Sequence, residues 1–201
     1  MVEFQIKDRG IKSPAVIKAL RTVPRHELVP IIYRLSAYED RPLPIGENQT
    51  ISQPYIVGLM SELLRAKPGD KILEIGTGSG YQAAVLAEMG LQVYSIEIIE
   101  PLAERATADL KRLGYLDVEV RHGDGYQGWP EEAPFDSIII TAAPPQLPQP
   151  LVEQLKTGGR IVGRDNQDLI VYTKRLNGKV SKKRIIPVRF VPMTGRAQED
   201  P

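Results

Sequence analysis

The chain has 201 residues, 42% of them hydrophobic and 25% charged, and its 26 basic and 25 acidic residues leave a net charge of +1. This length predicts one structural unit with a core of its own, and the composition excludes disordered and collagen-like chains. With no cysteine and two histidines, the sequence excludes thiol nucleophiles, thiolate metal sites and histidine-rich metal centres, and no metal site is expected.

The near-zero charge is an average over two unlike parts. Residues 1–150 hold 15 basic and 20 acidic residues, whereas residues 151–201 hold 11 and 5. Seven basic residues and no acidic one lie between Lys174 and Arg189. This basic segment is either a solvated strand face or a surface for an anionic partner.

Two further features bear on location. No apolar run reaches the ~18 residues that a membrane span needs, and residues 1–10 lack the apolar core of a secretory signal. We therefore expect a cytoplasmic protein that does not enter a membrane.

Residues 1–50 are predicted to form an irregular helical extension. Ser13 and Pro14 form a helix-start signal, a capping hydroxyl followed by proline, and predict a short helix to about residue 20. Prolines at 24, 30, 42 and 44 break any longer element, so short helical turns are expected there. We expect residues 51–201 to form the main domain and the whole chain to be one structural unit.

Helical and strand patterns alternate from residue 54 onwards. The expected helices cover residues 54–64, 81–89, 101–113 and about 151–155; the expected strands cover 71–75, 91–97, 118–120, 137–141, 158–163 and 168–176. This alternation predicts an α/β fold with a doubly wound, mostly parallel sheet. Asn177-Gly178 is a two-residue hairpin signal, so the sheet is expected to end in an antiparallel hairpin.

A glycine-rich turn is expected where the first parallel strand joins its helix. It contains Gly76 and Gly78, and ligands of open α/β sheets bind at this place because glycine lets the backbone approach them closely. Glu97 closes the next strand, where a carboxylate can accept both hydroxyls of a ribose. Asp124, with Gly125 beside it, follows the third strand and could accept from an adenine amino group. Together these positions predict an adenosine pocket.

Either NAD or S-adenosylmethionine could fill such a pocket. The turn reads G-x-G-x-G, whereas the dinucleotide pattern G-x-G-x-x-G would place its third glycine where Tyr81 stands. Glu74, at the end of the first strand, would repel a pyrophosphate but suits a ligand with an ammonium group and a sulfonium. The charges favour S-adenosylmethionine.

Several segments then resemble one family, the protein-L-isoaspartate O-methyltransferases, which have the class I methyltransferase (Rossmann-like) fold. The segments are VPRHELVP at 23–30, TISQPYIV at 50–57, ILEIGTGSGYQAAVLA at 72–87, GDGYQGWP at 123–130, PFDSIIITAAPP at 134–145, LVEQLKTGGRIV at 151–162 and RFVPMTG at 189–195. The glycine turn is common to class I methyltransferases, while the others are more specific. Residues 163–166 depart from the family, which usually has Pro and Gly there.

The resemblance implies a protein-repair enzyme that methylates the α-carboxylate of L-isoaspartyl residues in damaged proteins and peptides, with S-adenosylmethionine as cofactor. A carboxylate with a pKa near 4 is already ionised at neutral pH, so this reaction needs no general base. It needs the carboxylate oxygen aligned with the sulfonium–methyl bond at roughly 3 Å.

The resemblance also implies roles for single residues. Ser52 matches the active-site serine and would orient the substrate carboxylate, although its position alone suggests a cap for the helix at residue 54. Gln53 is placed at the cofactor. Val191 to Thr194 are placed at the substrate rim, where backbone groups could pair with an extended peptide.

Two alternatives stay open. One is a class I methyltransferase that acts on RNA or a small molecule; the basic segment would favour RNA. The other is a protein that senses the cofactor without catalysis. For the repair enzyme we expect a monomer that does not bind nucleic acid.

Overall fold

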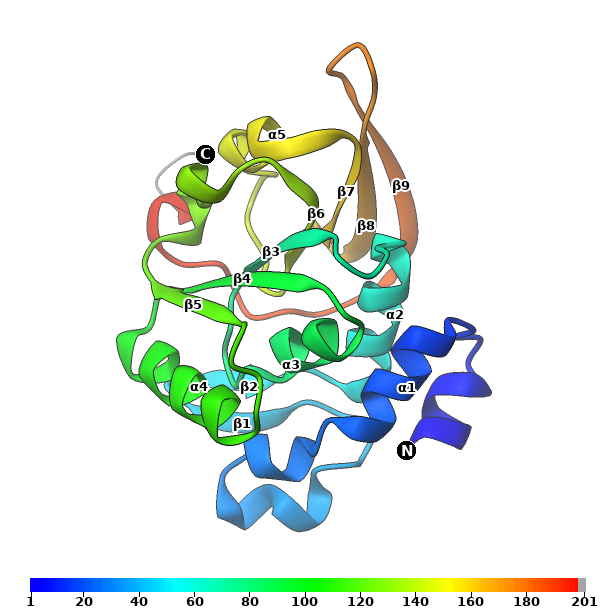
Figure 1. Ribbon diagram of the computed structural model, residues 1–201, viewed down its shortest axis with the longest axis vertical. Coiled ribbons are helices and arrows are strands. Elements are labelled where there is room, and N and C mark those ends of the chain that lie inside the picture. Colours follow the sequence, from blue (N-terminus) through cyan, green and yellow to red (C-terminus); the bar gives the residue numbers. More distant parts are fainter. Residues whose placement is uncertain (199–201) are drawn as a thin grey trace.

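The computed structural model describes residues 1–198, and a seven-stranded sheet forms its centre (Figure 1). Its strand order is β5-β4-β3-β6-β7-β8-β9. The strands are β3 (Lys71–Ile75), β4 (Gln92–Glu97), β5 (Glu119–His122), β6 (Phe135–Ile140), β7 (Leu155–Asp165), β8 (Asp168–Lys174) and β9 (Val180–Pro187). β3 to β7 run parallel, and β8 and β9 pair antiparallel. The predicted doubly wound sheet with an antiparallel end is confirmed.

Two apolar cores cover the two faces of this sheet. The helices are α1 (Pro14–Thr22), α2 (Pro54–Leu64), α3 (Tyr81–Glu88), α4 (Glu100–Arg112) and α5 (Gln149–Gln154). α1 to α4 contribute to one core and α5 to the other, which Figure 1 shows as layers on opposite sides of the sheet. Successive strand residues point to opposite faces, so Ile72 belongs to the first core and Leu73 to the second.

Helix starts follow the proline positions. Ser13 caps α1 by accepting a hydrogen bond from the Val16 amide at 3.4 Å, and Pro14 is the first helical residue. α2 begins at Pro54 in the same way, but its N-cap is Gln53, whose side chain makes no capping bond. The interpretation of Ser52 as the helix cap is therefore wrong, because the cap position falls one residue later.

The N-terminal residues add to the first core. They form a π-helix η1 (Val2–Lys7), the 3-10 turns η2 (Arg25–Leu28) and η3 (Ile31–Ser36), and a hairpin of β1 (Leu43–Gly46) and β2 (Gln49–Ile51). Ile6 and Leu20 are buried in the same cluster as Ile72 of β3. η1 and the hairpin were not expected from the sequence, and the predicted division at residue 50 lies inside β2.

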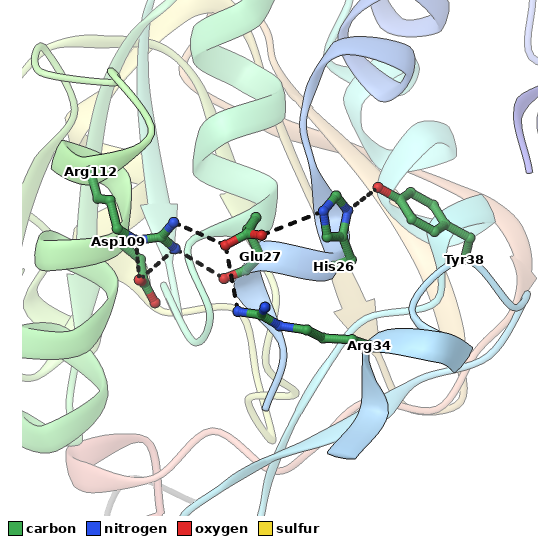
Figure 2. A network of polar contacts seen from close by, with 6 residues as sticks. All are labelled: His26, Glu27, Arg34, Tyr38, Asp109 and Arg112. Atoms are coloured by element: carbon green, nitrogen blue, oxygen red, sulfur yellow. Dashed lines mark hydrogen bonds and ion pairs between the residues drawn. The ribbon is translucent and has the colours of Figure 1, made fainter. Parts of the chain in front are cut away.

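A polar network ties η2 to α4 (Figure 2). Glu27 lies at its centre: Arg112 of α4 reaches the Glu27 carboxylate at 3.0 Å and its carbonyl oxygen at 3.2 Å. Arg34 approaches the same carboxylate at 3.5 Å, and His26 hydrogen-bonds the Tyr38 hydroxyl at 2.6 Å. The network fastens the N-terminal extension to α4, the helix that follows β4.

The chain after β9 returns across the molecule. Figure 1 shows it running from the β9 edge back to the side of β5. It pairs with the loop after β6, where the Ala143 amide donates to the Val191 carbonyl at 2.8 Å and the Met193 amide to the Ala143 carbonyl at 2.9 Å. It ends in the turn η6 (Gly195–Gln198); two more 3-10 turns, η4 (Gly125–Gln127) and η5 (Pro130–Glu132), follow β5.

Within residues 1–198, no helix is both long and apolar enough to cross a membrane.

Candidate active site

Two cavities adjoin at the carboxyl ends of β3, β4 and β6. We call the first the glycine cleft; it is lined by the glycine turn, the end of β4, Gly125 and parts of β2 and of the returning chain, namely residues 49–52, 57, 75–79, 81–82, 96–99, 125, 141–142 and 191–194. We call the second the arginine cavity; it is lined by residues 42, 50, 52–53, 56, 141, 164, 167 and 187–191. Four residues line both cavities: Thr50, Ser52, Thr141 and Val191.

The glycine turn forms the floor of the first cavity. Gly76 and Gly78 have φ angles of +95° and +54°, in the left-handed region that favours glycine. A Cβ on Gly76 would lie under 3.0 Å from Oγ1 of Thr141, which donates to the Gly76 carbonyl at 2.6 Å. The turn therefore packs directly against Thr141, the residue after β6, and a side chain on Gly76 would displace the turn.

Glu97 supplies the carboxylate at the end of β4. Its side chain lines the glycine cleft and is buried. Oε2 accepts from the Gly78 amide at 2.8 Å, and Oε1 accepts from the Ile99 amide at 3.0 Å. These two bonds hold the carboxylate still, and each oxygen keeps further lone pairs for hydroxyl donors.

Glu74 lies behind the turn and does not line the cleft. It is fully buried, its Oε2 accepts from the Ser95 hydroxyl at 2.5 Å, and its Oε1 has no hydrogen-bond partner among the described residues. Burial raises the pKa of Glu74 to about 8; the Ser95 bond opposes this rise and the nearby Glu97 charge adds to it. A positive ligand above the turn would favour the ionised form of this carboxyl.

The charges of the glycine cleft fit S-adenosylmethionine. Among residues 1–198, Glu97 is the only charged side chain in its lining, and no Lys, Arg or His is present. A pyrophosphate would find no cation there. A ribose would find the Glu97 carboxylate, and an ammonium or a sulfonium would favour the ionised form of Glu74 behind the turn. The residues therefore fit the cofactor that the sequence predicted.

Asp124 and Gly125 are neighbours in the sequence, but only Gly125 lines the glycine cleft. Gly125 lines the cleft, and a Cβ there would lie under 3.0 Å from Cγ2 of Ile75. Asp124 is outside the lining; its Oδ1 accepts from the Tyr126 amide at 2.9 Å and its Oδ2 from the Arg196 amide at 2.8 Å. Its carboxylate therefore joins the returning chain to η4, a role that no local sequence pattern predicts.

Ser52 and Gln53 are neighbours with different surroundings. Ser52 lies on the wall shared by both cavities, and its side chain makes no hydrogen bond to another described residue. Gln53 lines only the arginine cavity, and its Nε2 donates to the Asp40 carbonyl at 3.0 Å. The position predicted for Gln53, at the cofactor, is therefore not where its side chain lies.

Val191 and Thr194 both line the glycine cleft, and Val191 also lines the arginine cavity. The Val191 carbonyl and the Met193 amide are already bonded to Ala143. Only part of the predicted backbone rim is therefore open to a peptide.

The arginine cavity has the opposite charge. Arg164 and Arg189 line it together with Gln167, and no acidic residue does among those described. In the sequence, Arg189 ends the basic segment, and residues 163–166, which include Arg164, depart from the family pattern. No sequence pattern predicts that Arg164 lines the same cavity as Ser52. The two are 112 residues apart, and only the packing of β7 beside α2 brings them together.

The comparisons with known proteins decide the family. The sequence model of the family described as Protein-L-isoaspartate(D-aspartate) O-methyltransferase matches residues 1–198. The chain belongs to this family. A protein-L-isoaspartate O-methyltransferase of Gloeobacter violaceus is 57% identical over 96% of this chain and 97% of its own, and one of Methanoculleus marisnigri is 52% identical over 98% and 90%.

Solved structures agree. One protein-L-isoaspartate O-methyltransferase has a TM-score of 0.86 at 30% identity and covers 98% of this chain and 67% of its own. A Plasmodium falciparum protein described as a putative member of the family, in complex with S-adenosyl-L-homocysteine, has a TM-score of 0.77 at 26% identity and covers 94% of each chain.

The predicted family, fold, enzyme class and cofactor are thereby confirmed. This member of the family is a class I methyltransferase that takes its methyl group from S-adenosylmethionine and acts in the repair of isoaspartyl damage. The alternatives of an RNA or small-molecule methyltransferase and of a sensor without catalysis have no support in these relationships.

Proposed function

We propose that this chain holds S-adenosylmethionine in the glycine cleft and receives the isoaspartyl residue through the arginine cavity, with Ser52 aligning the two at the shared wall. One observation carries the proposal: Ser52 lines both cavities and its hydroxyl makes no bond to another described residue. That hydroxyl is available to donate to the α-carboxylate of the substrate.

Alignment is the main task of these residues. Bound S-adenosylmethionine supplies a methyl group on a sulfonium, which an ionised carboxylate attacks without a general base. The Ser52 hydroxyl would hold one oxygen of the substrate carboxylate and leave the other oxygen aligned with the methyl group that the cofactor would supply. Because opposite charges combine into neutral products, shielding the junction from water favours this step.

The cofactor residues divide the remaining work. Glu97 accepts the ribose hydroxyls, while the amides of Gly78 and Ile99 hold its carboxylate. Gly76 and Gly78 shape the turn on which the ligand lies, and Gly125 lets the chain pack directly against Ile75 in the wall of the cleft. Glu74 balances the positive charge of the ligand from behind the turn, through the orphan Oε1.

The substrate side uses other groups. Gln53 supports the Asp40 carbonyl and faces the peptide, and Asp124 positions η6. The Val191 amide and the Thr194 backbone are left to pair with an extended peptide, because the Val191 carbonyl is bonded to Ala143.

The partners follow from the same site. We propose isoaspartyl-containing proteins and peptides as substrates and a monomer as the active form, in which Ser52 lies on the wall that the two cavities share. No nucleic-acid partner is proposed, because Lys174, Lys182 and Arg184 of the basic segment are bound to carbonyls or carboxylates. A cysteine-free chain is compatible with the reducing cytoplasm.

A peptide pair tests the proposal. Matched L-isoaspartyl and L-aspartyl peptides are incubated with labelled S-adenosylmethionine, and methyl transfer to the isoaspartyl peptide alone is expected. Ser52→Ala should lower kcat about 10- to 100-fold, the effect of one lost charge-assisted hydrogen bond, and keep the Kd of S-adenosylhomocysteine within about twofold. Ser181→Ala, in the distant hairpin, is the matched control. A weakened Kd with unchanged kcat would assign Ser52 to the cofactor instead.

A further inference from the structure

The arginine cavity contains two cations without acidic partners. Neither Arg164 nor Arg189 forms an ion pair with any residue in the described part of the chain. Arg164 Nη1 makes one long contact with the Phe190 carbonyl at 3.5 Å, and its buried Nε has no acceptor within residues 1–198. A half-buried guanidinium with free donors is a strong site for a carboxylate, which it can bind through two parallel hydrogen bonds.

The two carboxylates that follow Arg164 most closely in the chain, Asp165 and Asp168, are bound to other partners. Successive residues of β7 face opposite sides of the sheet, so Arg164 shares a face with Arg160, which donates to the Leu63 carbonyl of α2 at 3.0 Å. Asp165 lies on the other face, where it binds Lys182 and Tyr172. Asp168 is bound to Arg184 at 2.7 Å. Arg164 is therefore left facing α2 and the cavity without a counter-ion.

The cavity is the approach to Ser52. Ser52 and Gln53 directly precede α2, and Ile56 of α2 lines the same cavity as Arg164. Arg189 follows Val188, whose amide donates to the Gln167 carbonyl at 2.8 Å, so both arginines stand around one opening. A peptide whose isoaspartyl residue reaches Ser52 must pass its neighbouring residues along these two cations.

We propose that Arg164 and Arg189 make this enzyme selective for isoaspartyl sites that have an acidic residue close by in the sequence. This inference rests on the proposed function, since it assumes that the peptide occupies the arginine cavity. The two arginines are specificity-determining residues: they hold the flanking carboxylate, whereas the reacting carboxylate is held by Ser52. Within the basic segment, Lys182 and Arg184 form ion pairs with Asp165 and Asp168, whereas Arg189 forms none with a described residue. Arg189 is therefore the member of the segment that can select substrates.

The test compares three L-isoaspartyl peptides that differ at one position. One has Gln two residues before and two residues after the isoaspartyl residue; the others have Glu at the first or the second of these positions. We expect the wild-type kcat/KM for at least one Glu peptide to exceed that for the Gln peptide about 3- to 10-fold at low salt, and the ratio to shrink as salt rises.

Variants then show which residues cause the higher kcat/KM for the Glu peptide relative to the Gln peptide. Arg164→Gln and Arg189→Gln should each bring the Glu-to-Gln ratio towards 1, Arg164→Lys should restore part of it, and Lys183→Gln should leave it unchanged. Lys183 is the matched control because it is exposed on β9 and does not line the cavity. Because the ratio is taken within each variant, a general loss of activity does not imitate the effect.

Four outcomes would overturn the proposal. They are equal rates for all three peptides in the wild type, an equal loss on all three in Arg164→Gln, a ratio that falls as much in Lys183→Gln, and inhibition by a single-stranded RNA that Arg164→Gln relieves. The equal loss would mean that Arg164 holds the reacting carboxylate, and the RNA result that the cavity serves another ligand. Methylation of none of the three peptides would instead refute the proposed function.

Discussion

The two cavities on either side of Ser52 differ in charge and in how their charges are held. In the glycine cleft, the Glu97 carboxylate is fixed by two backbone amides, and the buried Glu74 carboxyl behind it has a raised pKa and would ionise more readily beside a positive ligand. In the arginine cavity, Arg164 and Arg189 have no acidic partner within the described residues and one of them is exposed. Tight binding of one invariable cofactor suits the first arrangement, and acceptance of many different peptides suits the second.

The largest effect is expected from a side chain in the floor of the glycine cleft. Gly76→Ala adds a Cβ that meets Oγ1 of Thr141 at a φ of +95°. We expect the affinity for S-adenosylmethionine, measured by calorimetry, to fall about 100-fold or more, since the turn must shift away from β6.

Gly69→Ala separates the clash from the backbone strain. Gly69 has a similar φ of +89°, but a Cβ there meets nothing within 4 Å. This variant should lose about 1–2 kcal/mol of stability and bind the cofactor almost normally. Equal losses of affinity in both variants would contradict the account of the turn.

A smaller effect is expected from the carboxylate at the end of β4. Glu97→Ala removes the acceptor for the ribose and releases the Gly78 amide. The Kd of S-adenosylmethionine should rise about 10- to 100-fold, which corresponds to hydrogen bonds with a charged group. Glu100→Ala, an exposed carboxylate three residues later, is the control and should leave the Kd unchanged. If the two variants bind alike, Glu97 does not hold the ribose.

The pH dependence of stability tests the buried carboxyl behind the turn. In the folded protein the pKa of Glu74 is about 8, above the value of 4.5 for a free carboxyl, so folding takes up a proton between these two pH values. The free energy of unfolding is therefore highest for this group below pH 4.5 and falls as pH rises to about 8, by at most ~1.4 kcal/mol per pH unit.

Glu74→Gln should remove this slope. Urea unfolding from pH 5 to 9 measures the free energy of unfolding of the wild type and of the variant. As pH rises, this free energy should fall more for the wild type than for the variant. A constant difference would show that Glu74 keeps an ordinary pKa in the folded protein.

The smallest effect is expected outside both cavities. Arg112→Gln breaks the contacts with Glu27 and Asp109 that Figure 2 shows, all of them at partly exposed side chains. We expect thermal denaturation to show a loss of about 1 kcal/mol or less, and kcat/KM to stay unchanged. A change in cofactor affinity would extend the site to the N-terminal extension.

The sequence predicted the glycine cleft far better than the arginine cavity. Gly76, Gly78 and Glu97 follow from a general rule, because the carboxyl ends of neighbouring parallel strands meet at one edge of the sheet. Arg164 obeys no such rule; its place beside Ser52 depends on the pairing of β7 with β8 and on α2 packing over β7.

Three local expectations failed for physical reasons, the third being Gln53, which lines the arginine cavity and not the glycine cleft. The sequence predicts Ser52 as a helix cap, but Pro54 starts α2 and makes Gln53 the cap residue. The sequence predicts that Asp124 meets an adenine, but it lies outside the lining of the glycine cleft, where its oxygens accept from the amides of Tyr126 and of Arg196, 72 residues away. Contacts across such distances are not visible in a local pattern.

A crystal structure with S-adenosylhomocysteine and an L-isoaspartyl peptide would test the central claim most directly. We predict that the thioether lies in the glycine cleft, that the isoaspartyl carboxylate accepts from the Ser52 hydroxyl at hydrogen-bond distance, about 3 Å, and that the flanking residues lie along Arg164 and Arg189. A peptide bound away from the arginine cavity, or a carboxylate out of reach of Ser52, would contradict the account.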